Sequence, residues 1–388
     1  MPGKKGRNKN DIKFEDVSSY SSSKEYRKKK KNRRGRTVLK SIFGLFCGLL
    51  IVAGSGLIYL STGLLSEVSG SAITLTKDEL LISPDATTDD KITNIAFFGV
   101  DARDGTFKGL SDSIMVLTVD NKHDKIKMTS ILRDSRVQMA GYDGYNKINA
   151  AYSEFAYPKD GGPELAIKTL NSNFMLNIED YVTVNFSYMA DIVNAFGGTV
   201  VTMDDSEAFQ TNKNINALMY ELIHRGYERT IWEDDFLPED ENGVVRGGTL
   251  TLNGNQAVAY ARNRSDSDGS RSDRQKKVLM GLFSQLENYG TSDYYSLAQE
   301  ILPLCETSLD FKDIWGLAPI ITKNFEIETL TIPGDMERAD GKDFGDGLGW
   351  VWRYDIDSAA EHIDRFIYEE GSPYWDAASG NGADNWDE

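Results

Sequence analysis

The chain has 388 residues, with 43 lysines and arginines against 60 aspartates and glutamates, which gives a formal net charge of −17. Acidic residues outnumber basic ones over the whole chain, and we expect no nucleic-acid partner. Two cysteines are too few for a disulfide scaffold, and three histidines without ligand spacing make a zinc centre unexpected.

The N-terminal segment differs in charge from everything after it. Residues 1–40 hold 15 basic and 4 acidic side chains, which leaves 28 basic and 56 acidic side chains for the remainder. The apolar content of this segment is too low for a folded core. We therefore predict a disordered, basic, cytoplasmic arm that is drawn to anionic membrane lipid.

An uncharged, mostly apolar stretch follows, from Ser41 to Leu60. At about 1.5 Å per residue, a helix over residues 41–61 spans a hydrocarbon core of about 30 Å. Basic residues crowd only its N-terminal flank, so the positive-inside rule predicts a single-pass protein of the cell membrane with a cytoplasmic N-terminus and an extracellular domain. A cleaved signal peptide is the alternative, but the long basic leader favours an uncleaved anchor.

The remainder divides into an extracellular spacer over residues 62–90, one catalytic domain over 91–370 and an acidic flexible tail over 371–388. Short apolar runs predict strands at residues 95–100, 113–119, 125–132, 181–186, 199–203, 326–332 and 350–354. Helical periodicity predicts helices at 147–157, 163–175, 187–196, 253–261, 272–289, 292–305 and 358–368. The polar residues 206–250 are expected to be an irregular insertion that covers the site or projects from it. This alternation predicts a layered α/β domain.

Two carboxylates flank the loop between the first two predicted strands. Asp101 follows the strand that ends at Val100, with Arg103 beside it, and Asp112 precedes the next strand. In α/β sheets ligands bind at such strand ends, and two carboxylates there can hold a hard divalent cation such as Mg²⁺. The alternative is structural, with Asp112 capping a turn and Asp101 paired with Arg103.

Positive groups follow the third predicted strand and begin the next helix. Arg133 and Arg136 are suited to bidentate contacts with phosphate oxygens, although an exposed salt bridge with Asp134 is the commoner role for such residues. Lys147 and Asn149 begin the helix predicted at residues 147–157, and its N-terminal dipole would favour an anion.

The densest basic run lies between residues 260 and 277 and contains Arg262, Arg264, Arg271, Arg274 and Gln275. Residues 278–286 carry an apolar stripe at helical spacing, which extends backwards onto Gln275, Arg274 and Arg271. Guanidinium groups on an inward face have to pair with carboxylates or line a cavity that receives an anion, because an unpaired buried charge is too costly. The run therefore indicates a phosphate-binding site.

These clusters, in this order and behind one predicted membrane span, resemble the motifs of the LytR-CpsA-Psr family of envelope proteins over residues 93–285. The motifs are Asp101-x-Arg103 with Gly109-x-Ser-Asp112-Ser, Ser130-Ile-Leu-Arg133-Asp134-x-Arg136, Lys147-Ile-Asn149-Ala-Ala-Tyr152, and Ala259-Tyr260-Ala-Arg262-Asn-Arg264 running on to Asp268-x-x-Arg271-x-x-Arg274-Gln275. Family members commonly have Phe-Gly where this chain has Gly269 and Ser270, a departure that affects the local turn and not the charges.

The resemblance implies a three-layer α-β-α sandwich around a central mixed sheet, with a hydrophobic tunnel for a polyprenyl chain. It also implies a phosphotransferase that moves a polyprenyl-pyrophosphate-linked anionic glycopolymer, such as a teichoic acid or capsule polysaccharide, onto peptidoglycan as a phosphodiester. The implied metal is Mg²⁺ or Mn²⁺, held by Asp101 and Asp112. The implied partners are the lipid-linked donor, the peptidoglycan acceptor and membrane lipid.

Individual residues take implied roles from the same motifs. The pyrophosphate would be gripped by Arg103, Arg133, Arg136, Lys147, Arg262, Arg264, Arg271, Arg274 and Gln275. The catalytic set would be Asp101, Arg103, Asp112, Asp268 and Arg271, and any of the three aspartates could deprotonate the accepting hydroxyl. Two other functions stay open from the sequence: a polyprenyl-phosphate sensor that signals through the basic arm, and a polyprenyl pyrophosphate hydrolase.

Overall fold

The computed structural model describes residues 73, 75–100, 107, 109–225, 231, 233–263, 268–285, 297, 300–309 and 326–375. The predicted basic arm, the predicted membrane helix and residues 376–388 of the predicted tail lie outside these ranges. Within the described part of the chain, no helix combines the length and the apolar character needed to cross a bilayer.

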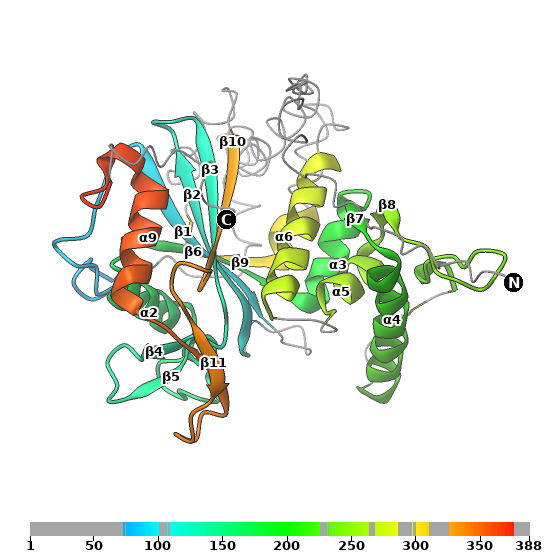
Figure 1. Ribbon diagram of the computed structural model, residues 1–388, viewed down its shortest axis with the longest axis horizontal. Coiled ribbons are helices and arrows are strands. Elements are labelled where there is room, and N and C mark those ends of the chain that lie inside the picture. Colours follow the sequence, from blue (N-terminus) through cyan, green and yellow to red (C-terminus); the bar gives the residue numbers. More distant parts are fainter. Residues whose placement is uncertain are drawn as a thin grey trace, which may run out of the picture.

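A six-stranded mixed sheet forms the centre of the domain (Figure 1). Its strands are β1 (Ile92–Val100), β2 (Ser111–Asp120), β3 (Lys125–Ile131), β6 (Asp180–Asn185), β9 (Cys305–Thr307) and β10 (Glu326–Ile332), in the spatial order β10-β3-β2-β1-β6-β9. The pairs β1–β6 and β3–β10 are parallel, and the other three neighbouring pairs are antiparallel. The central mixed sheet predicted above is confirmed.

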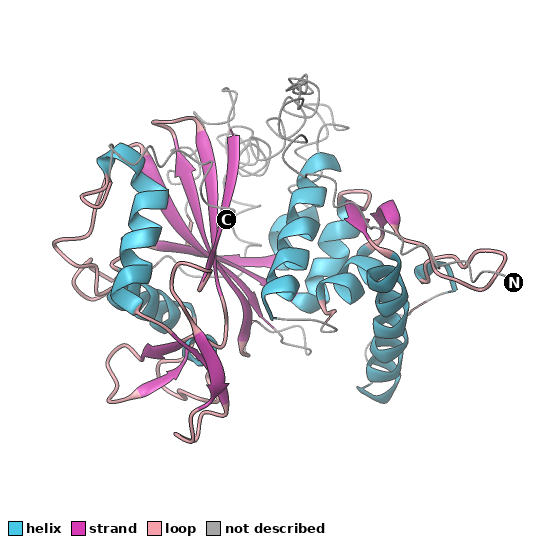
Figure 2. Cartoon of the chain, viewed as in Figure 1, coloured by secondary structure: helices cyan, strands magenta, loops and turns pink. Residues whose placement is uncertain are grey.

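Helices cover both faces of this sheet (Figure 2). On one face, α2 (Pro163–Phe174) and α9 (Ile356–Tyr368) bury their apolar stripes in a shared core with Phe98 and Tyr152. On the other face, α3 (Phe186–Ala195), α5 (Gly254–Ala261) and α6 (Asp268–Gln285) enclose a second core with Ile95 and Val184. Both faces of β1 and β2 are therefore apolar, as in a three-layer arrangement.

Two glycines allow the second helical layer to pack closely. A Cβ at Gly281 of α6 would lie 2.3 Å from the Val200 carbonyl of β7 (Thr199–Met203), and one at Gly254 would lie 2.0 Å from the Ala190 carbonyl of α3. Any side chain at these positions would push backbone apart, so α6 is held at a fixed distance from its neighbours. Its position matters because α6 carries the basic run.

Two short antiparallel hairpins lie beside one end of the sheet (Figure 1). They are β4 (Arg136–Gln138) with β5 (Tyr145–Lys147), and β11 (Asp340–Asp343) with β12 (Trp350–Arg353). We call residues 136–147 and 340–353 together the hairpin lobe. The turn between β11 and β12 contains Gly345, Gly347 and Gly349, all with positive φ, a backbone region that glycine adopts without steric cost.

Three of the predicted elements were wrong. Residues 206–225, the first part of the segment expected to be irregular, lie in the 21-residue helix α4 (Asp205–Arg225), which packs against α5. The helix predicted at 147–157 is instead the end of β5 followed by a five-residue 3-10 helix, Ile148–Tyr152, so no long helix dipole points at Lys147. The helix predicted at 292–305 is replaced at its C-terminal end by a 3-10 turn, Leu302–Leu304, and by β9.

The remaining elements complete the domain. β7 pairs with β8 (Gly248–Leu252), and single 3-10 turns lie at Glu233–Asp235 and Glu369–Gly371. Leu80 and Ile82, within the segment expected to be a spacer, are buried in the core that α2 and α9 cover.

Candidate active site

Segments that are distant in the sequence meet at one end of the sheet and form a polar pocket, which we call the mouth. β2 supplies Asp112 and Ser113, the segment after β3 supplies Arg133, and the first turns of α6 supply Arg271 and Gln275. These side chains surround a small pocket with a volume of about 10 Å³. Two arginines predicted to bind pyrophosphate thus lie in the same pocket as one of the carboxylates predicted to bind metal.

Ion pairs fix the charged groups at the mouth. Arg133 Nη1 lies 2.6 Å from Asp112 Oδ1, and Arg133 Nε lies 3.1 Å from Asp134 Oδ2. Lys147 Nζ lies 2.7 Å from the other oxygen of Asp134. Arg271 is only 4% exposed, and a guanidinium group keeps its charge inside proteins. The charges are therefore positioned before a ligand binds, and such preorganisation is what makes an anion site effective.

An apolar cavity lies next to the mouth, between the sheet and the helices of the second layer. Its volume is about 50 Å³. The lining side chains are Phe97, Met115, Leu117, Met128, Val184, Met189, Ile192, Phe196, Leu279, Leu282, Ile301 and Cys305. Burial raises the pKa of the Cys305 thiol to about 12, so this side chain is also uncharged. Three of the lining residues are methionines, whose flexible thioethers adapt to a ligand, and the cavity suits a hydrocarbon chain.

Two elements, α6 and β2, contribute side chains to both the mouth and the cavity. On α6, Arg271 and Gln275 line the mouth, and Leu279 and Leu282 line the cavity at the following helical steps. On β2, alternate residues share a face, and Ser113 at the mouth is followed by Met115 in the cavity. An amphipathic ligand can therefore place its charged group between the arginines and its apolar part in the cavity. The inward stripe predicted for α6 is confirmed at these positions.

Two of the predicted arginines are bound elsewhere. Arg274 is also buried, and its Nε donates to Glu207 Oε1 of α4 at 2.8 Å. Arg136 Nε donates to Asp346 Oδ2 of the hairpin lobe at 3.0 Å, and its guanidinium lies over the Tyr145 ring. Arg274 thus ties α6 to α4, and Arg136 ties the two hairpins of the lobe together.

The other predicted site residues are partly outside the described ranges. Arg262 is half-buried at the C-cap of α5. Asp101, Arg103 and Arg264 fall outside the described residues, as does the side chain of Asp268, the first residue of α6. The structure therefore brings together Asp112, Arg133, Arg271 and Gln275, with Lys147 joined to them through Asp134.

The sequence did not identify the residues that line the cavity. Met115, for example, lies in a strand that is buried on both faces, and a pattern of that kind shows only that a segment is buried. It does not show which of the two faces borders empty space. The one usable signal was the stripe on α6, because its polar beginning marks the face that turns toward the mouth.

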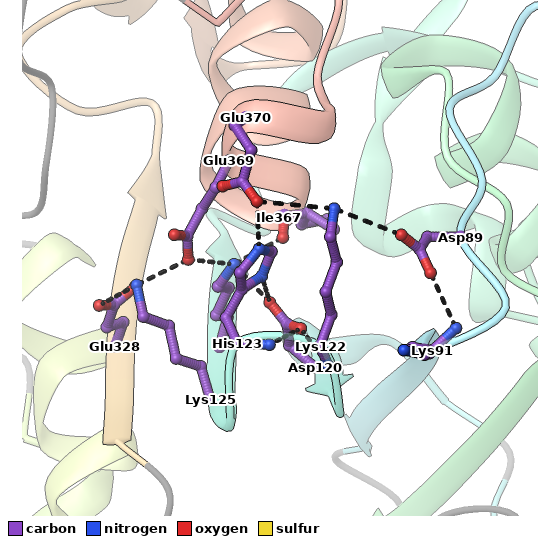
Figure 3. Close-up of polar contacts among 11 residues, drawn as sticks. Asp89, Lys91, Asp120, Lys122, His123, Lys125, Glu328, Ile367, Glu369 and Glu370 are labelled. Atoms are coloured by element: carbon purple, nitrogen blue, oxygen red, sulfur yellow. Dashed lines mark hydrogen bonds and ion pairs between the residues drawn. The ribbon is translucent and has the colours of Figure 1, made fainter. Parts of the chain in front are cut away.

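A second polar cluster lies at the opposite end of β2 (Figure 3). Ligand atoms of Asp120, His123 and Glu369 are close enough together to hold a metal ion. The ammonium group of Lys127, however, lies between two of them, 3.0 Å from Asp120 Oδ2 and 2.9 Å from Glu369 Oε1. Because a cation already balances these carboxylates, the cluster is well explained as an ion-pair network that joins β3 to the end of α9.

Replacing Lys127 with methionine is expected to destabilise the domain by about 3 kcal/mol. The Lys127 side chain is fully buried and also donates to the Ile367 carbonyl at 2.6 Å. Its loss would remove a positive charge that balances the carboxylates of Asp120 and Glu369. Chemical denaturation of the full-length chain measures the change. Lys77→Met, which removes an exposed pair with Glu179, is the control and should cost less than about 0.5 kcal/mol. Equal effects of the two substitutions would contradict the prediction.

The stability of the domain is expected to depend on the protonation of His123. Burial disfavours the imidazolium, but its hydrogen bonds to Asp120 at 2.6 Å and Glu370 at 2.9 Å outweigh this and raise the pKa of His123. Lys122, Lys127 and Glu369 also face this cluster. Because the pKa of His123 is higher in the folded state than in the unfolded state, protonation of His123 stabilises the fold. This stabilisation is complete below the unfolded-state pKa of about 6.5 and is lost as pH rises through the folded-state pKa.

The thermal midpoint of the native chain should therefore exceed that of a His123→Gln variant most at pH 5.5, and the difference should shrink as pH rises above about 6.5. Thermal unfolding of both proteins from pH 5.5 to 8.5 checks this. A difference that grows with pH would contradict the sign of the effect.

Comparisons with known proteins place this geometry in context. The LytR_cpsA_psr family model matches residues 64–354 of the chain. TagV of Bacillus subtilis, named as a polyisoprenyl-teichoic acid–peptidoglycan teichoic acid transferase, is 31% identical over 312 residues, which cover 77% of this chain and 72% of TagV. TagT of the same organism, which carries the same functional name, is 28% identical over 323 residues and covers 80% of this chain and 90% of TagT.

Solved structures show the same fold. The crystal structure of B. subtilis TagV aligns with a TM-score of 0.53 and 27% identity over 73% of this chain and 98% of that one. A structure described as TagT bound to LI-WTA aligns with a TM-score of 0.52 and 25% identity over 72% of this chain and 93% of that one.

Proposed function

The chain belongs to the LytR-CpsA-Psr family, and we propose that it is a membrane-anchored phosphotransferase. It transfers a polyprenyl-pyrophosphate-linked anionic glycopolymer to peptidoglycan and forms a phosphodiester bond, in line with the names of its teichoic acid transferase relatives. The observation that carries this proposal is that α6 and β2 each line both the arginine-bearing mouth and the apolar cavity. This combination matches a ligand with a diphosphate head and an isoprenoid tail.

The mouth supplies the groups that a pyrophosphate needs. Arg133 and Arg271 neutralise its oxygens, and Gln275 can donate a further hydrogen bond. Phosphoryl transfer depends mainly on positioning and on stabilising developing charge, so fixed guanidinium groups in a partly buried pocket are well suited to it. Asp112 and Asp134 hold Arg133 from two sides and so orient it toward the pocket.

The reaction breaks a phosphoanhydride bond and forms a phosphate ester bond. The hydroxyl oxygen of the acceptor attacks the phosphorus that bears the glycopolymer, the bond from that phosphorus to the bridging oxygen breaks, and polyprenyl phosphate leaves. The hydroxyl proton passes to a carboxylate, for which we propose Asp101, Asp112 or Asp268. Arg271 and Arg133 stabilise the charge that develops on the leaving polyprenyl phosphate. The isoprenoid tail remains bound in the cavity and so holds the phosphate end of the lipid at the mouth.

We further propose that Asp101 and Asp112 bind Mg²⁺ or Mn²⁺. Carboxylate oxygens are the hard ligands that these ions prefer, and Asp112 lies in the mouth. A bound divalent ion would neutralise part of the diphosphate charge. We place the domain outside the cell, anchored by residues 41–61, because a polyprenyl donor and a peptidoglycan acceptor meet at the outer face of the membrane.

A transfer assay tests this function directly. The full-length chain in liposomes is given a polyprenyl-pyrophosphate glycopolymer with a labelled phosphate, together with Mg²⁺ and insoluble peptidoglycan. We expect the label in the peptidoglycan fraction and polyprenyl phosphate in the lipid fraction. Label released as a soluble glycopolymer phosphate would instead indicate hydrolysis. Removing residues 1–30 should leave transfer intact, whereas a sensor that signals through the arm would not transfer at all.

A further inference from the structure

The hairpin lobe presents aromatic side chains beside the mouth, and we propose that it binds the glycan strand of the acceptor. This inference rests on the proposed function, because it takes peptidoglycan as the acceptor. It adds a binding site for one substrate to a pocket that otherwise accounts only for the donor.

The lobe is built directly on the residues that form the mouth. The backbone N–H of Trp352 donates to the Asp134 carbonyl at 3.0 Å, and Ser135 forms a bridge with Trp352. Arg136 and Lys147 are partners in the β4–β5 ladder, and Lys147 is ion-paired with Asp134. The same short segment therefore carries the ion pairs of the mouth and anchors the lobe.

Aromatic rings stand on the lobe in fixed positions. Trp350 is 40% exposed and Tyr145 is 52% exposed, although both rings are in contact with neighbours. The Trp350 and Trp352 rings meet edge to face with centroids 4.8 Å apart. A Cβ at Gly341 would lie 2.7 Å from the Trp350 ring, so only glycine leaves room for the pair. Aromatic rings held in this way offer flat apolar faces that can stack on the apolar faces of sugar rings.

Charged contacts hold the two hairpins rigidly against each other. Asp346 accepts from Arg136 Nε at 3.0 Å and from Arg353 Nη2 at 2.7 Å. The Arg353 guanidinium lies 3.7 Å from the Phe344 ring centroid, and that of Arg136 lies 3.9 Å from the Tyr145 centroid. The aromatic side chains are thus ordered before binding, and little side-chain entropy is lost when a ligand stacks on them.

The charge of the lobe favours the acceptor over the donor polymer. Residues 136–147 and 340–353 together contain four basic side chains, Arg136, Lys147, Lys342 and Arg353, and four acidic ones, Asp143, Asp340, Asp343 and Asp346. A surface with no net charge gives no attraction to a polyanionic glycopolymer. It suits the uncharged sugar rings of a glycan strand, and its position beside the mouth would bring an acceptor hydroxyl toward the diphosphate.

Binding of soluble peptidoglycan glycan strands, with their stem peptides removed, tests the inference. The full-length chain is used in detergent micelles, and the affinities for the strands and for a polyprenyl pyrophosphate are measured separately. Trp350→Ala and Tyr145→Ala should each weaken strand binding about tenfold and leave lipid binding unchanged. Tyr220→Ala, which removes a 63% exposed tyrosine from α4, is the matched control and should change neither affinity.

Two results would overturn the inference: wild-type strand affinity in both lobe variants, or an equal loss of strand and lipid affinity in both. Thermal unfolding of each variant identifies a loss of fold, and Trp350→Phe, which keeps a flat ring, should restore most of the binding. A different result would refute the proposed function without refuting this inference. A native chain that binds strands and lipid but transfers nothing would refute the transferase and leave the lobe site standing.

Discussion

Replacing Arg271 with alanine is expected to lower the rate of glycopolymer transfer by about 10²- to 10³-fold. This guanidinium is only 4% exposed and lines the mouth with Arg133, so no other side chain of the described pocket can take over its charge without moving. The loss should appear mainly in kcat, because the charge on the diphosphate rises as the bond to polyprenyl phosphate breaks. Single-turnover transfer in liposomes measures it.

Two further substitutions control this prediction. Arg271→Lys retains the charge without the planar fork, and should recover only part of the activity. Arg246→Ala removes an exposed arginine paired with Asp205 and Asp240, and should leave transfer unchanged. If a well-folded Arg271→Ala protein transfers at the native rate, Arg271 has no part in the chemistry.

Replacing Leu279 with aspartate is expected to weaken polyprenyl pyrophosphate binding by about 100-fold or more. Leu279 lines the cavity one helical step beyond Gln275, where the isoprenoid chain would lie. A bound tail would strip water from the new carboxylate, and such desolvation costs at least about 3 kcal/mol. Equilibrium binding of the labelled lipid to the full-length chain in micelles gives the affinity.

A substitution on the outer face of the same helix provides the control. Lys277 is exposed on α6, so Lys277→Asp changes the charge of the helix without reaching the cavity. Its lipid affinity should stay within about twofold of the native value. Unfolding curves of both variants are compared to exclude a general loss of structure. Native lipid affinity in the Leu279→Asp protein would mean that the tail binds elsewhere.

The strands of the domain were the most predictable part of the fold. β7 and β10 have the predicted bounds, and β1, β2, β3, β6 and β12 differ only at their ends. Their apolar runs are short and bounded by turn residues, and that pattern has few other interpretations. The order of the strands was not accessible, because β9 and β10 join the sheet from positions far along the chain.

Helix α4 was not predicted, because its sequence pattern does not indicate a helix. Its start is marked by a reciprocal cap in which the Asp204 side chain accepts from the Glu207 N–H at 2.8 Å and the Glu207 side chain accepts from the Asp204 N–H at 3.2 Å. The following residues include several asparagines, which have low helix propensity. Tertiary contacts compensate for them: Asn212 binds the Leu237 backbone, and Asn214 donates to the Ala259 carbonyl.

The sequence predicted that charged side chains would meet at the candidate site. It did not predict which neighbouring side chain each of them would contact. Arg133 and Arg271 were expected to converge, and they line one pocket. Arg274, on the same helix, was assigned to the same role, yet it lies against Glu207. Because residues 271 and 274 are three apart, both are compatible with one helix face, and only the position of α4 decides which of them reaches the mouth. That position depends on a helix that the sequence did not reveal.

Photo-crosslinking of a polyprenyl pyrophosphate to the full-length chain tests the central claim most directly. A diazirine on the isoprenoid, two units from the diphosphate, is activated in micelles, and the labelled residues are identified by mass spectrometry. Our account predicts label on cavity residues such as Met115, Met128 and Leu279, and loss of that label when unlabelled lipid competes. The surface also carries a separate groove, whose lining includes Tyr142, Lys168 and Glu306. Label confined to that groove, with none in the cavity, would contradict our account.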